Sequence, residues 1–454
     1  MMRFGQLFIL FLFLGGCIQR DETSKIAGGS EAPIKFPEWA KDAVIYEVNL
    51  RQFTPEGTFR AFKTHLSRLK NLGVEVICLL PIHPIGQVKR KGKLGSYYAV
   101  KDYLNINKEY GTHEDFRDLV ATAHDLGMYV ILDWVSDQTA WDHPLRTEHP
   151  EWYLKSPEGR FILPLPTDRE EVVALDYSNS ALRDYMIEAM KYWVDEFDMD
   201  GFRCNISGHV PTDFWIQARA DLSKSKAIFI LAAWEDHELD TAFEMSYANE
   251  LEYHMQLIAE GKESAASITN YLEKMLQTNA ADHVKVNFTS NHNKNAWEGT
   301  VFDRFGKAAE AFAVLTYVVE GIPLIYSGQE VGLKKRLKFF EKDSIDWGDH
   351  PFNSMYDRLG KLKSDNQALW NGHWGGKVQL IPNDRKSQVV SFSRQKAGNS
   401  VVALFNLSPQ SAKFSLQKDW FDEDYRRFKS RDRVRMLSEQ TITLPAWGYE
   451  LYIH

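Results

Sequence analysis

The feature that most constrains the fold of this chain is an alternation of short apolar runs and amphipathic stretches between about residues 40 and 330. Short, nearly continuous apolar runs are typical of parallel strands that are buried on both faces. We expect strands at Val44–Asn49, Val76–Leu80, Tyr129–Val135, Gly201–Asn205, Ala227–Ala232, Phe243–Tyr247, Val284–Phe288 and Ile322–Tyr326.

The stretches between these runs have helical spacing and carry helix start and stop signals. Thr112 and Ser180 each precede such a stretch and are predicted N-caps, because a hydroxyl oxygen can accept a hydrogen bond from the first amides of a helix. Gly73 and Gly127 are predicted to end helices. The expected helices include Phe59–Leu72, Glu114–Leu126, Ala181–Phe197 and Lys307–Val319.

Eight strands with intervening helices in a chain of 454 residues predict a (β/α)8 TIM barrel. An open, doubly wound sheet is the alternative, but no glycine-rich phosphate-binding turn follows the first strand. We place the barrel at residues 37–369, with a short insertion at 138–179 after the third strand. An insertion at that point should lie over the mouth of the barrel, where the strands end.

Residues 370–454 lack helical periodicity and predict a C-terminal antiparallel β domain. Apolar and polar residues alternate there in short runs separated by turn residues. The runs are Val389–Arg394, Ser400–Asn406, Ala412–Leu416 and Thr441–His454.

The first residues read as an export signal rather than as part of the fold. Arg3 is followed by the apolar run Leu7–Leu14 and then by two glycines and Cys17, which resembles a bacterial lipoprotein signal (1–17) with lipidation of Cys17. Simple secretion is the alternative, whereas the run is too short for a transmembrane helix. Residues 18–36 read as a flexible tether. We therefore expect an exported lipoprotein anchored in the cell envelope.

Composition narrows the classes of partner. The net charge of −8 and the absence of a basic stripe exclude nucleic acid as a partner. The 13 tryptophans suit a sugar-binding surface, because flat rings stack on the apolar faces of pyranoses, although large cores also use them. Cys78 and Cys204 lie in apolar runs and are predicted to be buried free thiols, so we expect neither disulfides nor a thiolate metal site.

Active sites of TIM barrels are built at the carboxyl ends of the strands. The segments at and near those ends are YEVNLRQFTPEGTF (46–59), LLPIHPIG (79–86), YAVKDY (98–103), DWVSDQ (133–138), GFRCN (201–205), SNHNK (290–294) and GIPLIYSGQE (321–330). In this order they resemble the α-amylase family, glycoside hydrolase family 13, from about Val44 to Glu330. The resemblance implies retaining chemistry at α-glucosidic bonds, with a nucleophilic carboxylate and an acid carboxylate about 5–5.5 Å apart.

The residues at the family's catalytic places differ from its pattern. Asn205 stands where the family has its nucleophilic Asp, and an uncharged amide is a poor nucleophile. Ala233 stands at the family's acid/base place. An alignment shifted by two residues would put Glu235 there instead, and Glu235 would lie roughly 6–7 Å closer to the mouth than residue 233. Asn293 stands at the place of the third carboxylate, and Gln138 replaces a histidine.

Other residues keep the family's pattern. Tyr98 matches its sugar-stacking aromatic residue, and Asp133, Arg203 and His292 match further sugar-site residues. Asp133 and Arg203 are alternatively a structural ion pair, because buried charges need partners. Asp137 and His209 fall where some members bind calcium, but two ligands are too few for Ca²⁺, so we expect no metal or other cofactor.

These residues predict a pseudoenzyme that binds α-glucans or maltooligosaccharides without cleaving them efficiently. One alternative is a working hydrolase or transglycosidase that uses Glu235, Asp236 or Asp137 from displaced positions. Another is a structural protein that binds protein partners and no sugar. We expect the pseudoenzyme to contact the membrane through its lipid anchor only.

Overall fold

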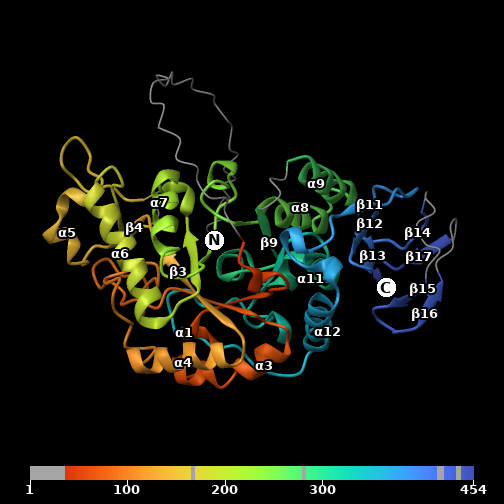
Figure 1. The fold of residues 1–454 in the computed structure, drawn as a ribbon, viewed down its shortest axis with the longest axis horizontal. Coiled ribbons are helices and arrows are strands. Elements are labelled where there is room, and N and C mark those ends of the chain that lie inside the picture. Colours follow the sequence, from red (N-terminus) through yellow and green to blue (C-terminus); the bar gives the residue numbers. More distant parts are fainter. Residues whose placement is uncertain (1–35, 165–168, 279–282, 417–423, 436–440) are drawn as a thin grey trace, which may run out of the picture. The chain divides into compact units, whose positions relative to one another are not determined.

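A computed structural model describes residues 36–164, 169–278, 283–416, 424–435 and 441–454. Within them, eight parallel strands close into a barrel in the order β1-β10-β9-β8-β7-β6-β3-β2 (Figure 1). The strands are β1 (Ile45–Val48), β2 (Val76–Leu79), β3 (Tyr129–Val135), β6 (Gly201–Asn205), β7 (Phe229–Ala232), β8 (Met245–Tyr247), β9 (Val284–Phe288) and β10 (Ile322–Tyr326). The predicted (β/α)8 barrel with a C-terminal antiparallel β domain is confirmed.

The predicted bounds of β3, β6, β9 and β10 match the structure, whereas β7 and β8 begin later than predicted. The predicted signal, with Cys17, and residues 18–35 of the predicted tether lie outside the described residues. Among the helices of the described ranges, none combines the length and the apolar character that a membrane span requires.

The helices surround the barrel (Figure 1). The predicted helix Phe59–Leu72 is wrong, because the chain forms two helices that break at Thr64. The Thr64 hydroxyl donates to the carbonyl of Ala61 at 2.8 Å and so competes with the helical ladder. The helices are α1 (Leu50–Phe53), α2 (Phe59–Lys63), α3 (Leu66–Asn71), α4 (His113–Asp125), α5 (Leu145–Glu148), α6 (Ser180–Phe197), α7 (Thr212–Leu222), α8 (Asn249–Ala259), α9 (Ala265–Thr278), α10 (Val301–Phe305), α11 (Ala309–Val318) and α12 (Pro351–Asp365).

Most of the predicted helix ends agree with the structure. Thr112 caps α4 in a capping box with Asp115, and Gly73 and Gly127 follow helix ends at φ of +85° and +66°. The prediction that Ser180 caps α6 is wrong. The residue before it is the cap, because the Asn179 side chain accepts hydrogen bonds from the first helical amides.

One glycine of the GFRCN segment is required by the barrel itself. A Cβ atom on Gly201 would lie 1.9 Å from the carbonyl oxygen of Phe229 on the neighbouring strand. Any larger residue would therefore push β6 away from β7. This close approach places the carboxyl end of β6, with Arg203 and Asn205, at the barrel mouth.

The insertion after β3 forms a small antiparallel pair, β4 (Gln138–Ala140) with β5 (Val172–Ala174). Its first strand begins directly beyond the end of β3. The hydroxyl of Tyr103 donates to the carbonyls of Val135 and Gln138, both at 2.9 Å. These bonds fix the start of the insertion at the barrel mouth.

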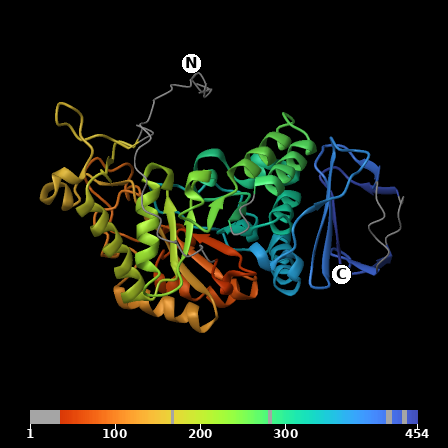
Figure 2. The same cartoon turned by 45° about the horizontal axis from the view of Figure 1, so that its top comes forward.

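The C-terminal strands form a six-stranded sheet in the order β11-β12-β13-β18-β15-β16 and a separate pair, β14-β17 (Figure 2). The predicted single run Thr441–His454 is wrong, because a turn that contains Trp447 at φ +57° divides it into two strands. The strands are β11 (Gln379–Leu380), β12 (Val389–Lys396), β13 (Asn399–Asn406), β14 (Ala412–Ser415), β15 (Asp424–Arg427), β16 (Arg433–Arg435), β17 (Thr441–Leu444) and β18 (Tyr449–Ile453).

A buried arginine joins the C-terminal sheet to the barrel. Arg394 on β12 donates from Nη1 to the carbonyl of Val319 at 2.8 Å, at the end of α11. It also donates from Nε to the carbonyl of Gly376 at 2.7 Å. Because the guanidinium is surrounded by carbonyl oxygens, its burial does not leave its hydrogen atoms without acceptors.

The barrel interior changes character along its axis. The amino ends of the strands enclose an apolar cluster that includes Ile45, Val76, Phe229 and Val284. Cys78 belongs to this cluster and is a buried free thiol, as is Cys204. At the carboxyl ends the interior is polar and charged.

Candidate functional site

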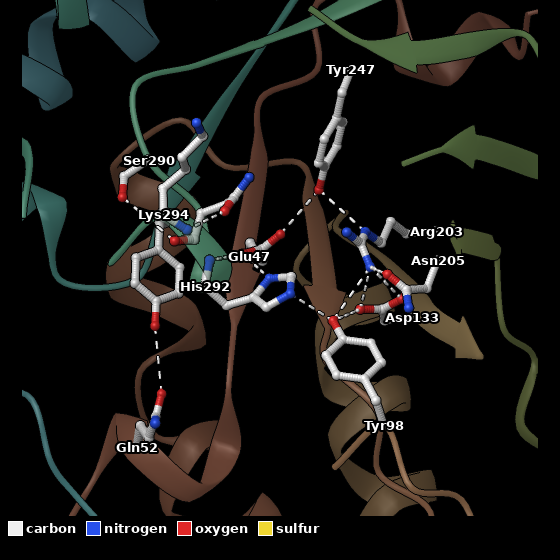
Figure 3. Close-up of polar contacts among 12 residues, drawn as sticks. Glu47, Gln52, Tyr98, Asp133, Arg203, Asn205, Tyr247, Ser290, His292 and Lys294 are labelled. Atoms are coloured by element: carbon white, nitrogen blue, oxygen red, sulfur yellow. Dashed lines mark hydrogen bonds and ion pairs between the residues drawn. The ribbon is translucent and has the colours of Figure 1, made fainter. Parts of the chain in front are cut away.

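Six polar side chains at the carboxyl end of the barrel contact one another in a closed cycle, here called the polar ring (Figure 3). They come from β1, β3, β6, β8 and the segments that follow β2 and β9. The members are Glu47, Tyr98, Asp133, Arg203, Tyr247 and His292.

One half of the polar ring is built on an ion pair. Arg203 Nη1 lies 2.8 and 2.7 Å from the two carboxylate oxygens of Asp133. The hydroxyl of Tyr98 donates to Asp133 Oδ2 at 2.6 Å. The structural ion pair that the sequence offered as an alternative is therefore present, and Asp133 is fully occupied.

The other half of the polar ring centres on His292. Its Nε2 lies 2.7 Å from the Tyr98 hydroxyl, and its Nδ1 lies 2.9 Å from Glu47 Oε1. The hydroxyl of Tyr247 donates to Glu47 Oε2 at 3.0 Å and accepts from Arg203 Nε at 3.3 Å, which closes the cycle. Each carboxylate of the ring thus faces a cationic or hydroxyl partner through both of its oxygens.

The polar ring is buried, and its environment shifts the pKa values of its two carboxyl groups. Glu47 and Asp133 are 0% exposed and His292 is 1% exposed. Burial raises the pKa of Asp133, and the nearby Arg203 and His292 offset this only in part. Burial alone would also raise the pKa of Glu47, but His292 and Arg203 outweigh it and leave that pKa below its usual value.

Asn205 adjoins the polar ring at the end of β6. Its Oδ1 accepts a hydrogen bond from Arg203 Nη1 at 3.0 Å, and the residue is 7% exposed. The next residue, Ile206, has φ +47°, a left-handed conformation that β-branched residues rarely adopt. Arg203 thus contacts both the Asn205 amide oxygen and the Asp133 carboxylate.

The two candidates for the acid place point in different directions. Ala233 packs against the apolar cluster of the barrel interior. Glu235 instead accepts a hydrogen bond from the Glu250 amide at 2.8 Å and pairs with Lys285 Nζ at 3.0 Å. Glu235 is not directed as it would be in a continued strand, because β7 ends at Ala232 and strand alternation stops there.

Glu235 lines a cavity of about 550 Å³ beside β9 and the helices α8 and α9. The Lys285 that holds it also donates to Ser246 on β8 at 3.0 Å. Ser246 alternates with Met245 and Tyr247, which face the barrel interior. Glu235 therefore lies on the outer side of the barrel wall rather than beside Asn205.

The remaining replaced places hold neutral groups. Asn293 is exposed and precedes a short helical turn, Lys294–Glu298. Gln138 is buried; its Nε2 donates to the Tyr98 carbonyl at 3.2 Å and its Oε1 accepts from Arg169 Nη1 at 2.7 Å. Gln138 thus ties the insertion to the segment that carries Tyr98.

Asp137, which was considered as a calcium ligand, lies beside the cationic side chain of Arg169. Asp137 Oδ2 lies 3.5 Å from Arg169 Nη2 and 3.7 Å from His209 Nδ1. Across the described ranges, no group of three or more His, Cys, Asp and Glu residues is placed to hold a metal ion. A guanidinium therefore lies beside Asp137, whereas Ca²⁺ prefers six to eight oxygens, and neither Asp137 carboxylate oxygen forms a hydrogen bond among the described residues.

Aromatic rings surround the polar ring on its outer side. Trp297 is 54% exposed and its ring centroid lies 5.3 Å from that of Phe339. Phe339 in turn lies 6.3 Å from Tyr98 with nearly parallel rings. Trp234, 39% exposed, packs against Gly208 beyond the end of β6. These rings provide flat apolar surface around the mouth.

Sequence reasoning missed three of the side chains that determine this arrangement. Glu47 and Tyr247 close the polar ring, and Arg169 occupies the position opposite Asp137. The signal for Glu47 was present, since a lone carboxylate in the apolar run Ile45–Val48 must find a partner when buried. Tyr247 and Arg169 gave no such signal.

Several described carboxylates near the mouth each have a charged or polar neighbour, although the carboxylate oxygens of Asp137 form no hydrogen bond among the described residues. Asp133 and Glu47 belong to the polar ring, Asp137 faces Arg169, and Glu235 faces away. Beside Arg203 the structure presents an amide, and at Ala233 it presents a methyl group. The arrangement can donate and accept hydrogen bonds, but it does not pair a nucleophile with an acid.

Comparison with known proteins matches this chain to one family. The family model for the alpha amylase catalytic domain matches residues 33–164 and 141–373. Alpha-amylase MalA from Haloarcula japonica is 25% identical over 422 residues that cover 86% of this chain. The chain spans 58% of the length of MalA.

Two solved structures are similar over nearly the whole chain. The noncanonic maltogenic alpha-amylase AmyB from Thermotoga neapolitana superposes with a TM-score of 0.83 at 30% identity, covering 91% of this chain and 99% of that chain. An alpha-amylase from Lactobacillus plantarum superposes with a TM-score of 0.82 at 29% identity, covering 92% of this chain and 99% of that chain.

Proposed function

The chain belongs to the α-amylase family, glycoside hydrolase family 13, and on that premise we propose that it is a pseudo-glycosidase that binds α-glucans without cleaving them efficiently. The observation that carries the proposal is the pairing of an amide with the family's arginine. Asn205 Oδ1 lies 3.0 Å from Arg203 Nη1, where the family pattern has a nucleophilic carboxylate. An amide keeps hydrogen-bonding capacity for sugar hydroxyls but cannot attack an anomeric carbon.

The polar ring supports the same conclusion. A carboxylate that is held in a buried ion pair with a second hydrogen bond is costly to detach for chemistry. Asp133 is in that state, and Glu47 is held by His292 and Tyr247. The loss of a general acid alone lowers rates by roughly 10²–10⁴.

The sugar would bind to the outer face of the mouth. Tyr98, the family's stacking residue, is only 7% exposed and Phe339 lies nearly parallel to its ring. Trp297 and Trp234 have the larger free surfaces. The partner proposed is an α-glucan or maltooligosaccharide, as the names of the similar proteins suggest.

Titration calorimetry with maltoheptaose tests binding and turnover together. Saturating heats with a stable baseline are expected, because binding without hydrolysis releases heat only on association. The variant Trp297→Ala should weaken the binding. The matched control is Tyr253→Ala, which removes an exposed ring on α8 and should bind as the wild type does. A drifting baseline would instead favour the hydrolase or transglycosidase that uses displaced carboxylates. No heat with any glucan would favour a protein that binds protein partners only.

A restoration series separates the candidates for the acid place. Asn205→Asp alone should not produce starch hydrolysis, because Ala233 leaves the leaving oxygen without an acid. Asn205→Asp combined with Ala233→Glu should give more activity than either single change. Near-normal hydrolysis from Asn205→Asp alone would contradict the assignment of Ala233 and revive Glu235.

We also propose that the protein is exported and anchored in the cell envelope through lipidated Cys17. The support is the basic, apolar and glycine-containing stretch before that cysteine. Growth with a labelled fatty acid should label the wild type and not Cys17→Ser. Equal labelling of both would exclude Cys17 as the lipidated residue.

A further inference from the structure

A cavity of about 760 Å³ lies away from the barrel mouth, between helix α12 and the strands β15, β16 and β18. Two aspartates, Asp365 and Asp424, also line it. Cations are nonetheless in excess at this cavity, in a chain whose net charge is −8. Six cationic side chains line it: Arg358, Lys361, Arg426, Arg427, Arg431 and Arg433.

Among the described residues these six cations lack counter-charges. In the part of the chain that the structure describes, none of the six has a carboxylate oxygen within 4.0 Å, although many other lysines and arginines do. Two of these cations also face each other, because Arg426 on β15 is the direct cross-strand partner of Arg433 on β16. Like charges at directly opposed positions destabilise an antiparallel pair.

Two of the arginines are held in place by the fold. Arg427 is half-buried, and its Nε is shielded from solvent without a hydrogen-bond partner among the described atoms. Arg358 extends from α12 with its guanidinium 5.2 Å from the centroid of Phe428. Its Nε donates to the Ser354 carbonyl at 3.3 Å and its Nη1 to the Lys429 carbonyl at 3.5 Å, which leaves Nη2 without a hydrogen-bond partner among the described residues.

The turn that joins β15 to β16 adds a third constraint. Arg431 has φ +63°, which is uncommon for a residue other than glycine, asparagine or aspartate. Its amide donates to the carbonyl of Arg427 at 2.9 Å, so the turn holds Arg431 close to β15. The cations therefore converge from a helix, two strands and a turn.

We propose that this cavity binds a phosphate-bearing anion. Guanidinium groups form paired, charge-assisted hydrogen bonds to phosphate oxygens, and several arginines around one hollow suit a dianion better than a single carboxylate. The anion would place its negative charge between Arg426 and Arg433 and supply an acceptor to Arg427. A free phosphorylated compound and a phospholipid headgroup share this chemistry.

The test titrates the full-length protein, in non-ionic detergent at low salt, with inorganic pyrophosphate and separately with glycerol phosphate, a phospholipid headgroup without acyl chains. Saturable binding is expected, together with a rise in melting temperature, because a ligand of the folded state stabilises it. The variant Arg426→Gln/Arg433→Gln should weaken the binding by about tenfold or more. The matched control Arg160→Gln/Lys413→Gln removes the same charge from exposed positions outside the cavity and should bind as the wild type does.

The probe that binds identifies the source of the phosphate. Tighter binding of pyrophosphate indicates a free phosphorylated ligand, and tighter binding of glycerol phosphate indicates a lipid headgroup. If Arg426→Gln/Arg433→Gln fails to fold, Arg358→Gln on α12 provides the same comparison from the other wall. No binding of either probe, or equal binding by the cavity variant and the control, overturns the proposal. Glucan binding at the mouth is independent of either outcome.

Discussion

The polar ring at the barrel mouth and the cavity beside α12 differ in whether their arginines have carboxylate partners. In the ring, Arg203 is 3% exposed and contacts both oxygens of Asp133. In the cavity, Arg426 is exposed, has no ion pair among the described residues and lies opposite another arginine. The same residue type is thus neutralised internally at one place and left without a counter-charge at the other.

The difference indicates what each region can do. A buried charge must be compensated within the fold, so the ring is complete without a ligand and its side chains are costly to move. An exposed, uncompensated cluster is tolerated by solvent and gains from an added anion. The charges at the barrel mouth are therefore compensated within the fold, whereas those at the cavity lack a counter-charge among the described residues.

The strongest test applies one substitution to both regions. Arg203→Met should lower the free energy of unfolding by about 3–5 kcal/mol, because it leaves Asp133 charged, buried and without its cation. Arg426→Met should change it by no more than about 0.5 kcal/mol, since it touches no partner. Urea unfolding measures both. Similar losses from the two substitutions would contradict the contrast drawn here.

His83 shows what burial does to a base without a counter-charge. Its ring is fully buried among Tyr103, Trp134 and Trp193, and burial lowers its pKa to about 4. The unfolded chain, with an ordinary histidine pKa near 6.5, therefore binds more protons between pH 6.5 and 4, so stability falls as the pH falls through that range.

The comparison of the wild type with His83→Phe isolates this effect. The wild type should lose about 2 kcal/mol more than the variant between pH 7 and pH 5. Urea unfolding at each pH measures the difference. A constant difference between the two proteins across this range would mean that His83 does not have a depressed pKa.

Tyr98→Phe breaks the polar ring without removing a charge. It deletes the hydroxyl that donates to Asp133 at 2.6 Å and contacts His292 at 2.7 Å. The expected loss of stability is about 1–2 kcal/mol, because buried partners are left unsatisfied. Tyr253→Phe, an exposed tyrosine on α8, is the matched control and should be neutral in thermal unfolding.

The smallest effect is expected in the cavity. Arg426→Gln/Arg433→Gln should stabilise the protein by at most about 0.5 kcal/mol at low salt, because it removes a like-charge pair. The gain should vanish at high salt, where exposed charges are screened. A clear loss of stability at low salt would mean that these arginines have partners within the fold.

The fold was largely predictable, because its signals are local. Each barrel strand lies in a short, mostly apolar run, and such a run is typical of a parallel strand that is buried on both faces. Strand bounds failed where the chain enters the barrel, at the amino ends of β7 and β8. The single helix expected over 59–72 failed because a side-chain hydrogen bond of Thr64 competes with the helix.

The site was predictable in the identity of its residues and not in their contacts. Asn205, Asp133 and Arg203 were named from the family resemblance, and they lie within strands, where alternation fixes the direction of the side chains. Glu235 was placed wrongly, because it follows the end of β7 and the direction of a loop residue depends on what it meets. It meets Lys285 and the amide of Glu250.

The sequence alone determined the barrel and which residues stand at the positions of interest, Asn205 and Ala233 among them, because apolar periodicity and residue identity are properties of the chain itself. Only the tertiary structure decided that Glu47 compensates His292, that Arg169 faces Asp137, and that arginines from α12, β15 and β16 share one cavity. Those pairings join residues far apart in the chain. Electrostatic and hydrogen-bond energies depend on distances of a few ångströms, which are fixed only when the barrel closes and the C-terminal sheet packs.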